Sequence, residues 1–320
     1  GNIGRKGVGV NPLRGQNNVQ GAADMGCQPH QGAGYFEVAD KKNQKFYTEK
    51  YGVTHPTKPG LKIPQMFEAA IEKKLKGLWI IGEDIVQTDP NSAHVVEAMN
   101  SLELLVVQEI FMSETAKLAT VVLPGTTFLE KDGTFTNTER RIQRVNRAVP
   151  PLPGTKPDGV IVTDMMQKLG FDQASYDADL MLKEIADVVP FFKGVTRERL
   201  GKLGLQWPVK EDGTDTQILH TETFKLGKGR LKNFDWKESS EIEANQKEYP
   251  LILTTSRVLQ HYNASTMTRR TKNINIVDED VLLIHPKDAT NRDLNTGDIG
   301  RLYSGRGEVA LKVEVTDKVK

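Results

Sequence analysis

The segment from Gly9 to Gly26 is rich in amides and reads GVNPLRGQNNVQGAADMG. Gly and Asn tolerate positive φ, and Pro12 pushes Asn11 toward extended backbone, so this composition predicts a loop and neither a helix nor a strand. Arg14 and Asp24 are its only charged residues, and its amide side chains can donate and accept hydrogen bonds. The segment is therefore suited to bind a polar anion; the alternative is a surface loop with capping amides.

Carboxylates follow two predicted strands. Asp84 comes after the apolar run 78–81, and Glu109 comes after the apolar run 102–107. In dinucleotide-binding folds an acidic side chain about 20 residues beyond the first strand accepts hydrogen bonds from ribose hydroxyls. Glu109 suits that role for a guanosine. The chain has no Gly-x-Gly-x-x-Gly motif, so an ordinary NAD site is not expected. The alternative is that both acids cap helices on solvated loops.

Strand and helix patterns alternate around these carboxylates. The predicted order is strand 78–81, helix 91–99, strand 102–107, helix 114–118 and strand 120–123. This alternation predicts an α/β fold with a doubly wound, mainly parallel sheet. Because the strands of such a sheet end at one edge, we expect the ligand to bind there.

The next stretch completes a first domain, predicted to cover residues 1–215. Residues 128–157 read as a hairpin insertion, with Asp132-Gly133 as a favourable turn. Residues 158–205 read as a helical segment, with amphipathic helices at 160–169 and 178–189.

From Tyr249 onward the pattern becomes all β. Short strands are predicted at 250–255, 281–284, 298–303 and 309–315, with glycines in the connection 304–307. Such strands suggest a small β-barrel. The polar stretch 206–246 marks the boundary before it, so the second domain is predicted at 216–320 and is expected to be truncated.

Composition excludes several classes of partner. Among the 320 residues, Lys and Arg total 43 and Asp and Glu total 42, a net charge of +1, so no strong field favours nucleic acid or a membrane surface. The longest apolar runs are too short to span a bilayer, and no signal peptide is recognisable. Neither zinc-type His spacing nor a Ser-His-Asp arrangement is recognisable. The single Cys27 excludes a disulfide within the chain, and a buried structural thiol is favoured over a nucleophile or metal ligand.

The Gly9–Gly26 segment closely resembles a loop of the catalytic subunit of molybdenum- or tungsten-dependent formate dehydrogenases, which carry bis(molybdopterin guanine dinucleotide). The resemblance implies that Arg14 sits beside the metal and the substrate, and that Gly15 and Gln16 lie against the pterin. It also implies that the guanosine dinucleotide is contacted at the positions of Asp84, Thr88, Gln108 and Glu109. Gly125 matches a position where the family often has a serine against the phosphate; here only the backbone N–H would remain.

Three further residues are assigned to the cofactor. A single carboxylate can accept both N1–H and the exocyclic amine of guanine, and Asp158 resembles the family's guanine-reading aspartate; the alternative is a helix N-cap, and both roles are compatible. Residues 254–262, TTSRVLQHY, resemble the stretch that touches a pterin and its phosphates. Arg257 is the natural phosphate partner because its planar fork binds oxyanions in bidentate fashion. His261 could bond a pterin edge, or be structural.

The resemblance implies oxidation of formate to carbon dioxide, or the reverse, with electrons passing to iron–sulfur clusters and an electron-transfer subunit. A cytoplasmic location is expected, with the periplasm left open. A cofactor-binding fragment without turnover and a nitrate reductase of the same superfamily are the alternatives. The choice between Mo and W, and between Cys and Sec as ligand, is left open.

The chain begins at Gly1, and the family's metal ligand and [4Fe-4S] cluster would precede it. We therefore expect an internal piece of a larger polypeptide, with no metal ligand of its own. Residues 1–320 alone are expected not to oxidise formate. We also expect the α/β part and the barrel to contribute the walls of a single cleft that holds the cofactor.

Overall fold

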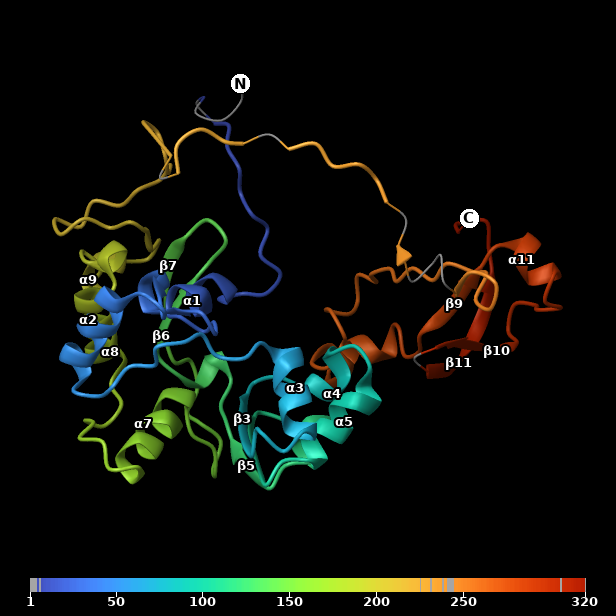
Figure 1. Ribbon diagram of the computed structural model, residues 1–320, viewed down its shortest axis with the longest axis horizontal. Helices are drawn as coiled ribbons and strands as arrows, with labels where there is room; N and C mark the ends of the chain where they lie inside the picture. Colours follow the sequence, from blue (N-terminus) through green and yellow to red (C-terminus); the bar gives the residue numbers. More distant parts are fainter. Residues whose placement is uncertain are drawn as a thin grey trace. The chain divides into compact units, whose positions relative to one another are not determined.

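The computed structural model describes residues 5, 7–224, 226–230, 232–237, 239–240, 245–305 and 307–319. Contacts divide the chain into two compact units: residues 1–82, 101–112 and 119–230 form unit 1, and residues 83–100, 113–118 and 231–320 form unit 2. Figure 1 shows their elements. Arg306, in the predicted connection 304–307, lies outside the described residues.

A parallel sheet in unit 1 confirms the predicted α/β class. It consists of β3 (Gly77–Ile81), β4 (Leu104–Glu109) and β5 (Val121–Pro124). Both neighbouring pairs are parallel, and the side chains of Leu105 and Val107 are buried, as expected for a strand that is covered on both faces. The order follows the chain, β3-β4-β5, so the described strands contain no reversal of order, and double winding stays a prediction.

The predicted hairpin is confirmed, but its turn was misplaced. β6 (Gly133–Thr136) pairs antiparallel with β7 (Arg141–Val145), and β8 (Leu205–Gln206) adds to β7. The turn lies at residues 137–140, after Asp132-Gly133 and the whole of β6. The Asn137 side-chain oxygen accepts hydrogen bonds from the backbone N–H groups of residues 139 and 141, which closes the turn there.

Unit 1 also contains a hydrophobic core centred on Ile142, Val189 and Phe192. Its α-helices are α1 (Val19–Asp24), α2 (Lys41–Tyr51), α3 (Ile63–Ile71), α7 (Asp158–Lys168), α8 (Ala178–Val188) and α9 (Arg197–Leu200). The short elements are β1 (Gln31–Gly32), η1 (Ala33–Tyr35), β2 (Phe36–Glu37), η2 (Phe128–Glu130) and η3 (Pro190–Phe192). Helix α1 was not expected, because it lies inside the segment predicted as a loop.

Unit 2 contains two groups of elements. The helices are α4 (Ile85–Thr88), α5 (Ser92–Asn100) and α6 (Glu114–Lys117). The C-terminal part has η4 (Thr268–Arg270), η5 (Lys272–Asn275), β9 (Val281–Ile284), α11 (Pro286–Thr290), β10 (Ile299–Ser304) and β11 (Gly307–Val315). β11 pairs antiparallel with β10 and parallel with β9, over a small core of Ile284, Ala289 and Val313.

Three of the four predicted C-terminal strands are confirmed. Residues 250–255 were predicted as a strand, but they form no regular element. Leu251, Ile252 and Leu253 are exposed there, so the apolar run is not buried as a core strand would be. The described strands form an open three-stranded sheet without barrel closure. No helix among the described residues is long and apolar enough to cross a membrane.

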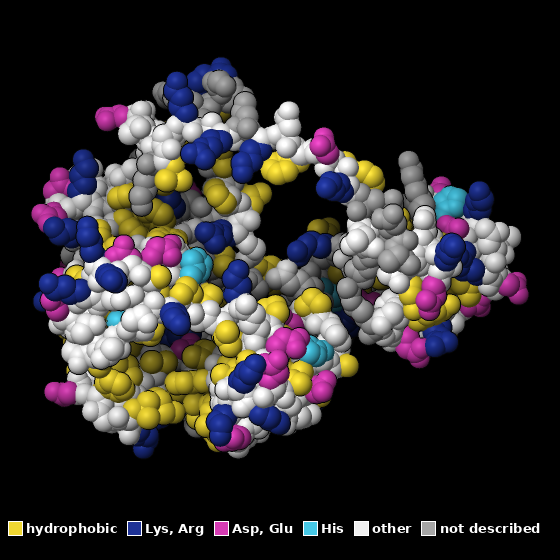
Figure 2. Space-filling view, viewed as in Figure 1, with side chains coloured by type: hydrophobic (Ala, Val, Ile, Leu, Met, Phe, Trp, Pro, Cys, Tyr) yellow, Lys and Arg dark blue, Asp and Glu magenta, His cyan; other side chains and the backbone are white. Residues whose placement is uncertain are grey.

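Basic and acidic side chains are interspersed over the face of each unit seen in Figure 2. No large region of one sign is visible on that face, in agreement with the net charge of +1.

Candidate functional site

Three predicted site residues meet at the carboxyl edge of the parallel sheet. Gln108, near the end of β4, donates from Nε2 to Oδ1 of Asp158 at 2.7 Å, and Asp158 is the first residue of α7. Gly125 follows β5, and its N–H donates to the carbonyl of Glu109 at 3.0 Å. A Cβ at Gly125 would lie 3.3 Å from Asp158 Oδ1, a tight contact that glycine avoids. We name Gln108, Gly125 and Asp158 the strand-end cluster.

Two buried polar atoms lie unpaired at this edge. Gln108 is only 1% exposed, so water does not reach its side chain freely, and its Oε1 has no hydrogen-bond partner among the described residues. The hydroxyl of Thr126, next to Gly125, is also buried without a partner among them. Such groups cost free energy unless a ligand satisfies them. A nucleotide has the donors and acceptors to do so, so these residues fit a dinucleotide cofactor.

Glu109 is the predicted ribose partner. It is the last residue of β4 and half-buried, and its Oε1 accepts a hydrogen bond from the backbone N–H of Ile110 at 2.7 Å. The ribose role stays a prediction.

Lys131 is a cluster partner that sequence reasoning missed. Its ammonium forms an ion pair with Oδ2 of Asp158, and both side chains are half-buried. The sequence feature that could have pointed to Lys131 is its position in the Lys-Asp-Gly-Thr stretch, which follows the third predicted strand. That stretch was interpreted only as part of a hairpin. Lys131 also lines a cavity of about 340 Å³, together with Asp132, Pro157 and Tyr176.

Arg14 lies in an exposed segment without regular secondary structure. The residues from Val8 to Gln16 form no regular element, and Arg14, Gly15 and Gln16 are all exposed. The segment leads into α1, whose N-cap Asn18 is in the left-handed region at φ 60°. The Asn18 side-chain oxygen accepts from the N–H of Thr136 at 3.0 Å, which ties this end of α1 to β6.

The other end of α1 is fixed by a buried carboxylate, Asp24. Its Oδ1 accepts from Gln20 Nε2 at 2.8 Å and from the Tyr35 hydroxyl at 2.7 Å, and its Oδ2 accepts from Trp207 Nε1 at 2.9 Å. Burial raises the pKa of Asp24, and these hydrogen bonds and the charge of Arg14 oppose the rise. The four side chains that meet here, Asp24, Gln20, Tyr35 and Trp207, are called the Asp24 network.

Asp84 and Thr88 lie in unit 2, around α4. Asp84 is buried, and its Oδ1 accepts from both the N–H (3.0 Å) and the hydroxyl (2.7 Å) of Thr115 in α6. Its Oδ2 is buried without a partner among the described residues. Thr88 is exposed and donates to Glu83 Oε1 at 3.0 Å. Asp84 therefore joins α4 to α6, and the nucleotide contact of both residues stays a prediction.

Arg257 and His261 lie in the C-terminal part of unit 2. Arg257 is exposed and donates to the Asn263 side-chain oxygen at 2.8 Å. His261 is buried; its Nε2 contacts the carbonyl of Val277 at 2.7 Å, and its Nδ1 contacts the hydroxyl of Thr268 at 3.0 Å. Because a carbonyl only accepts, Nε2 carries the proton. Both ring nitrogens thus have structural partners, and the pterin contact of His261 stays a prediction.

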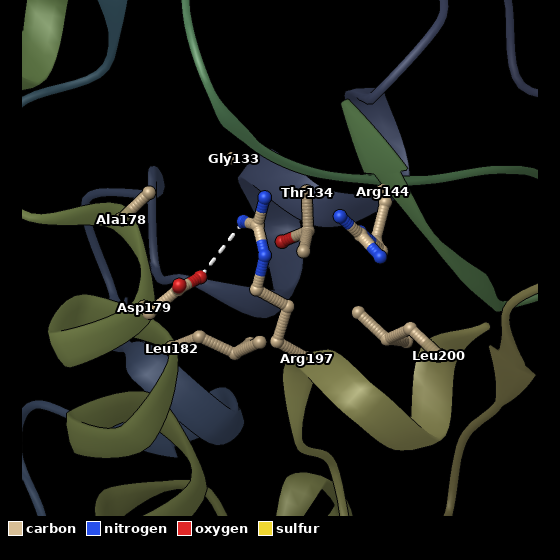
Figure 3. Close-up of a pocket in the computed structure, with 8 residues that line it drawn as sticks. All are labelled: Gly133, Thr134, Arg144, Ala178, Asp179, Leu182, Arg197 and Leu200. Atoms are coloured by element: carbon tan, nitrogen blue, oxygen red, sulfur yellow. Dashed lines mark hydrogen bonds and ion pairs between the residues drawn. The ribbon is translucent and has the colours of Figure 1, made fainter. Parts of the chain in front are cut away.

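A second, smaller hollow lies near the cavity beside Lys131 and shares Ala178, Asp179 and Arg197 with it. Figure 3 shows the side chains of Arg144 and Arg197 reaching into this hollow, with Asp179 paired to Arg197 at 2.8 Å. Its volume is about 10 Å³, enough for about one water molecule. It contains none of the predicted site residues.

No group of three or more His, Cys, Asp or Glu side chains in the described part of the chain could hold a metal ion. Cys27 is exposed, so the expectation of a buried thiol was wrong. It follows the glycine turn at Gly26 (φ 80°), where the chain leaves α1.

Comparison with known proteins places the chain in a family. Residues 1–168 match the molybdopterin oxidoreductase model, and residues 251–320 match the model of the molydopterin dinucleotide binding domain. The chain therefore belongs to the molybdopterin oxidoreductase family, as the sequence resemblance predicted.

The relatives include formate dehydrogenase subunits of methanogens. The chain is 43% identical over its whole length to the F420-dependent formate dehydrogenase subunit alpha of Methanocaldococcus jannaschii, and 42% identical to the F420-dependent formate dehydrogenase 1 subunit alpha of Methanococcus maripaludis. It covers 48% of each, so it spans about half the length of these relatives.

A solved structure with a similar fold is acetylene hydratase from Pelobacter acetylenicus. The TM-score is 0.58 at 20% sequence identity, over 85% of this chain and 40% of that one. This likeness concerns the fold alone.

Proposed function

We propose that the chain is part of the catalytic subunit of a formate dehydrogenase that oxidises formate to carbon dioxide, or runs the reverse reaction. The observation that supports this substrate is the 43% identity, over the whole chain, to formate dehydrogenase alpha subunits. The family match supports the coarser statement that the chain serves a molybdopterin oxidoreductase.

In this proposal the cofactor is bis(molybdopterin guanine dinucleotide) with Mo or W, and it supplies the two-electron redox chemistry. The strand-end cluster holds a guanosine, because Gln108 Oε1 is a buried unpaired acceptor and Asp158 retains free acceptor sites. The other residues assigned to the cofactor are Gly15, Gln16, Asp84, Thr88, Glu109, Arg257 and His261.

Arg14 is the residue proposed to act on the substrate. A guanidinium binds a carboxylate with two parallel hydrogen bonds, which fixes both its position and its orientation. Held in this way, formate would present its C–H bond in one direction, so that positioning and charge stabilisation lower the barrier. The exposure of Arg14 in this chain leaves its guanidinium accessible to a small anion.

The proposal includes partners that act beyond this chain. Electrons would leave through a [4Fe-4S] cluster in the preceding part of the polypeptide and an electron-transfer subunit. We place the enzyme in the cytoplasm. Domains at 1–215 and 216–320, double winding of the first and barrel closure of the second belong to the same proposal.

The substitution Arg14→Lys in the native enzyme tests the substrate role, because Lys keeps the charge and loses the fork. We expect kcat/KM for formate-dependent dye reduction to fall roughly 10- to 100-fold, as expected for the loss of one charged hydrogen bond. Cofactor content should stay unchanged. Arg5→Lys, in the same exposed N-terminal stretch, is the matched control. Unaltered formate kinetics in Arg14→Lys would remove its substrate role, and a cofactor-loaded native enzyme inert toward formate would refute the proposed reaction.

A further inference from the structure

Partners among the described residues occupy only half of the acceptor sites of the Asp158 carboxylate. A carboxylate offers about four acceptor sites. Gln108 Nε2 occupies one site on Oδ1, and the Lys131 ammonium pairs with Oδ2. About two acceptor sites therefore remain, and the Asp158 side chain is 36% exposed, so a ligand can reach them.

Lys131 has donors left as well. An ammonium has three N–H groups and no acceptor. One is directed to Asp158, and the side chain is only 24% exposed, so the remaining donors lie in a partly desolvated place. The pair thus presents acceptors and a cationic donor side by side.

The Watson–Crick edge of guanine is the complement of this pair. It carries the exocyclic amine and N1–H, which donate, and O6, which accepts. Adenine carries an amine at position 6 in place of O6. That amine is a donor and would face the ammonium of Lys131, which is also a donor. We propose that Lys131 and Asp158 together read guanine, with Asp158 accepting from N1–H and the exocyclic amine while Lys131 donates to O6. This inference rests on the proposed binding of a guanosine dinucleotide.

The backbone around Lys131 is fixed by the preceding residue. Glu130 Oε2 accepts from the N–H of Thr127 at 2.8 Å and from its hydroxyl at 2.9 Å, and Glu130 Oε1 accepts from the N–H of Leu152 at 3.0 Å. This capping box closes the turn of η2 directly before Lys131. The lysine is therefore presented from an ordered turn, which a specificity contact requires.

The Asp158 side of the pair is held by close packing. The ring of Tyr176 lies where a Cβ of Gly159 would be, at 2.2 Å from its nearest atom, so only glycine fits after Asp158. The Tyr176 hydroxyl donates to the carbonyl of Asp132 at 3.3 Å. Tyr176 thus joins the start of α7 to the residue after Lys131, and both members of the pair have defined backbone positions.

Binding of nucleotide probes to the 320-residue chain, measured by titration calorimetry, tests the inference. GDP is compared with 6-thio-GDP, in which sulfur, a weak acceptor, replaces O6, and with IDP, which lacks the exocyclic amine. The unaltered chain should prefer GDP to each analogue by about tenfold. Lys131→Met should abolish the preference over 6-thio-GDP and keep the preference over IDP. Lys131→Gln, whose amide can donate to O6, should restore part of the former.

Lys156→Met is the matched control, because Lys156 is also paired with an aspartate of α7, Asp164, on the surface. It should behave like the unaltered chain. If Lys131→Met retains the preference over 6-thio-GDP, or loses both preferences together, Lys131 does not read O6 and the inference is overturned. If the unaltered chain does not bind GDP, or if Asp158→Asn keeps the preference over IDP, the proposed guanosine site itself fails.

Discussion

The strand-end cluster and the Arg14 segment are both supported by unit 1, in opposite ways. Gln108, Gly125 and Asp158 lie at the ends of regular elements, are linked by a hydrogen bond and close contacts, and are largely buried. Arg14 lies in an exposed stretch without regular structure, whose nearest fixed point is α1. The first site is built by the sheet itself, whereas the second depends on how firmly α1 is anchored.

The Asp24 network and the strand-end cluster each contain a carboxylate, and we expect the two carboxylates to have separate roles. The Asp24 network fixes α1 and through it the start of the Arg14 segment, while the strand-end cluster addresses the cofactor. Changes in the first should lower stability, and changes in the second should lower nucleotide binding with little loss of stability. The following predictions test that separation.

Asp24→Ala should have the largest effect on stability. It leaves the donors of Gln20, Tyr35 and Trp207 buried and unpaired, so we expect the free energy of unfolding to fall by about 3–5 kcal/mol. Urea denaturation measures this. The control Asp164→Ala removes a half-exposed ion pair with Lys156 and should cost less than about 1 kcal/mol. Equal losses in the two variants would show that the Asp24 network anchors nothing.

Gly125→Val should weaken nucleotide binding more than it lowers stability. Its Cβ would lie 3.3 Å from Asp158 Oδ1, and the branched methyl groups would crowd the approach to the carboxylate. We expect guanosine binding to fall roughly tenfold and the free energy of unfolding to fall by only about 1–2 kcal/mol. Gly133→Val is the control, because the space around a Cβ there is open. A large stability loss without a binding defect would assign Gly125 to the fold alone.

The pH dependence of stability should show the smallest effect. Because burial raises the pKa of Asp24, the folded state binds the proton more tightly than the unfolded state. The stability contribution of that proton is fully present below the unfolded pKa and is lost as pH rises through the folded pKa. As pH rises above the ordinary carboxyl pKa of about 4, wild type should lose stability relative to Asp24→Asn, whose amide does not titrate. Parallel curves of unfolding free energy against pH would contradict this.

Regular elements explain what could be predicted from the sequence. Apolar runs at 78–81 and 102–107 predict parallel strands, and neighbouring parallel strands end at one edge of the sheet. The meeting of Gln108 and Gly125 follows from that rule, whereas Asp158 reaches the same edge from the first turn of α7. Lys131 was missed because its partner Asp158 is distant in sequence, and no local pattern encodes such an ion pair.

The wrong predictions concern sites where side-chain contacts override local composition. Asp132-Gly133 has turn composition, but the hydrogen bonds of Asn137 close the turn later. Helix α1 forms in a Gly- and Asn-rich stretch because Asp24 is bonded to Tyr35 and Trp207, far along the chain. The apolar run 250–255 has strand composition, yet the structure gives it no pairing strand in the described residues.

The amount of guanosine released from the purified native enzyme shows whether the strand-end cluster binds guanine. Acid hydrolysis of the enzyme and quantification of GMP per polypeptide should be carried out for wild type, Asp158→Asn and Asp164→Asn. If the strand-end cluster holds the guanine, Asp158→Asn should lose at least roughly half of the wild-type GMP, because its amide turns a donor toward donors and the cluster holds one of the two guanosines of the cofactor. Asp164→Asn, on the surface of the same helix, should retain it all. Wild-type GMP content in Asp158→Asn would show that the strand-end cluster does not hold the guanine.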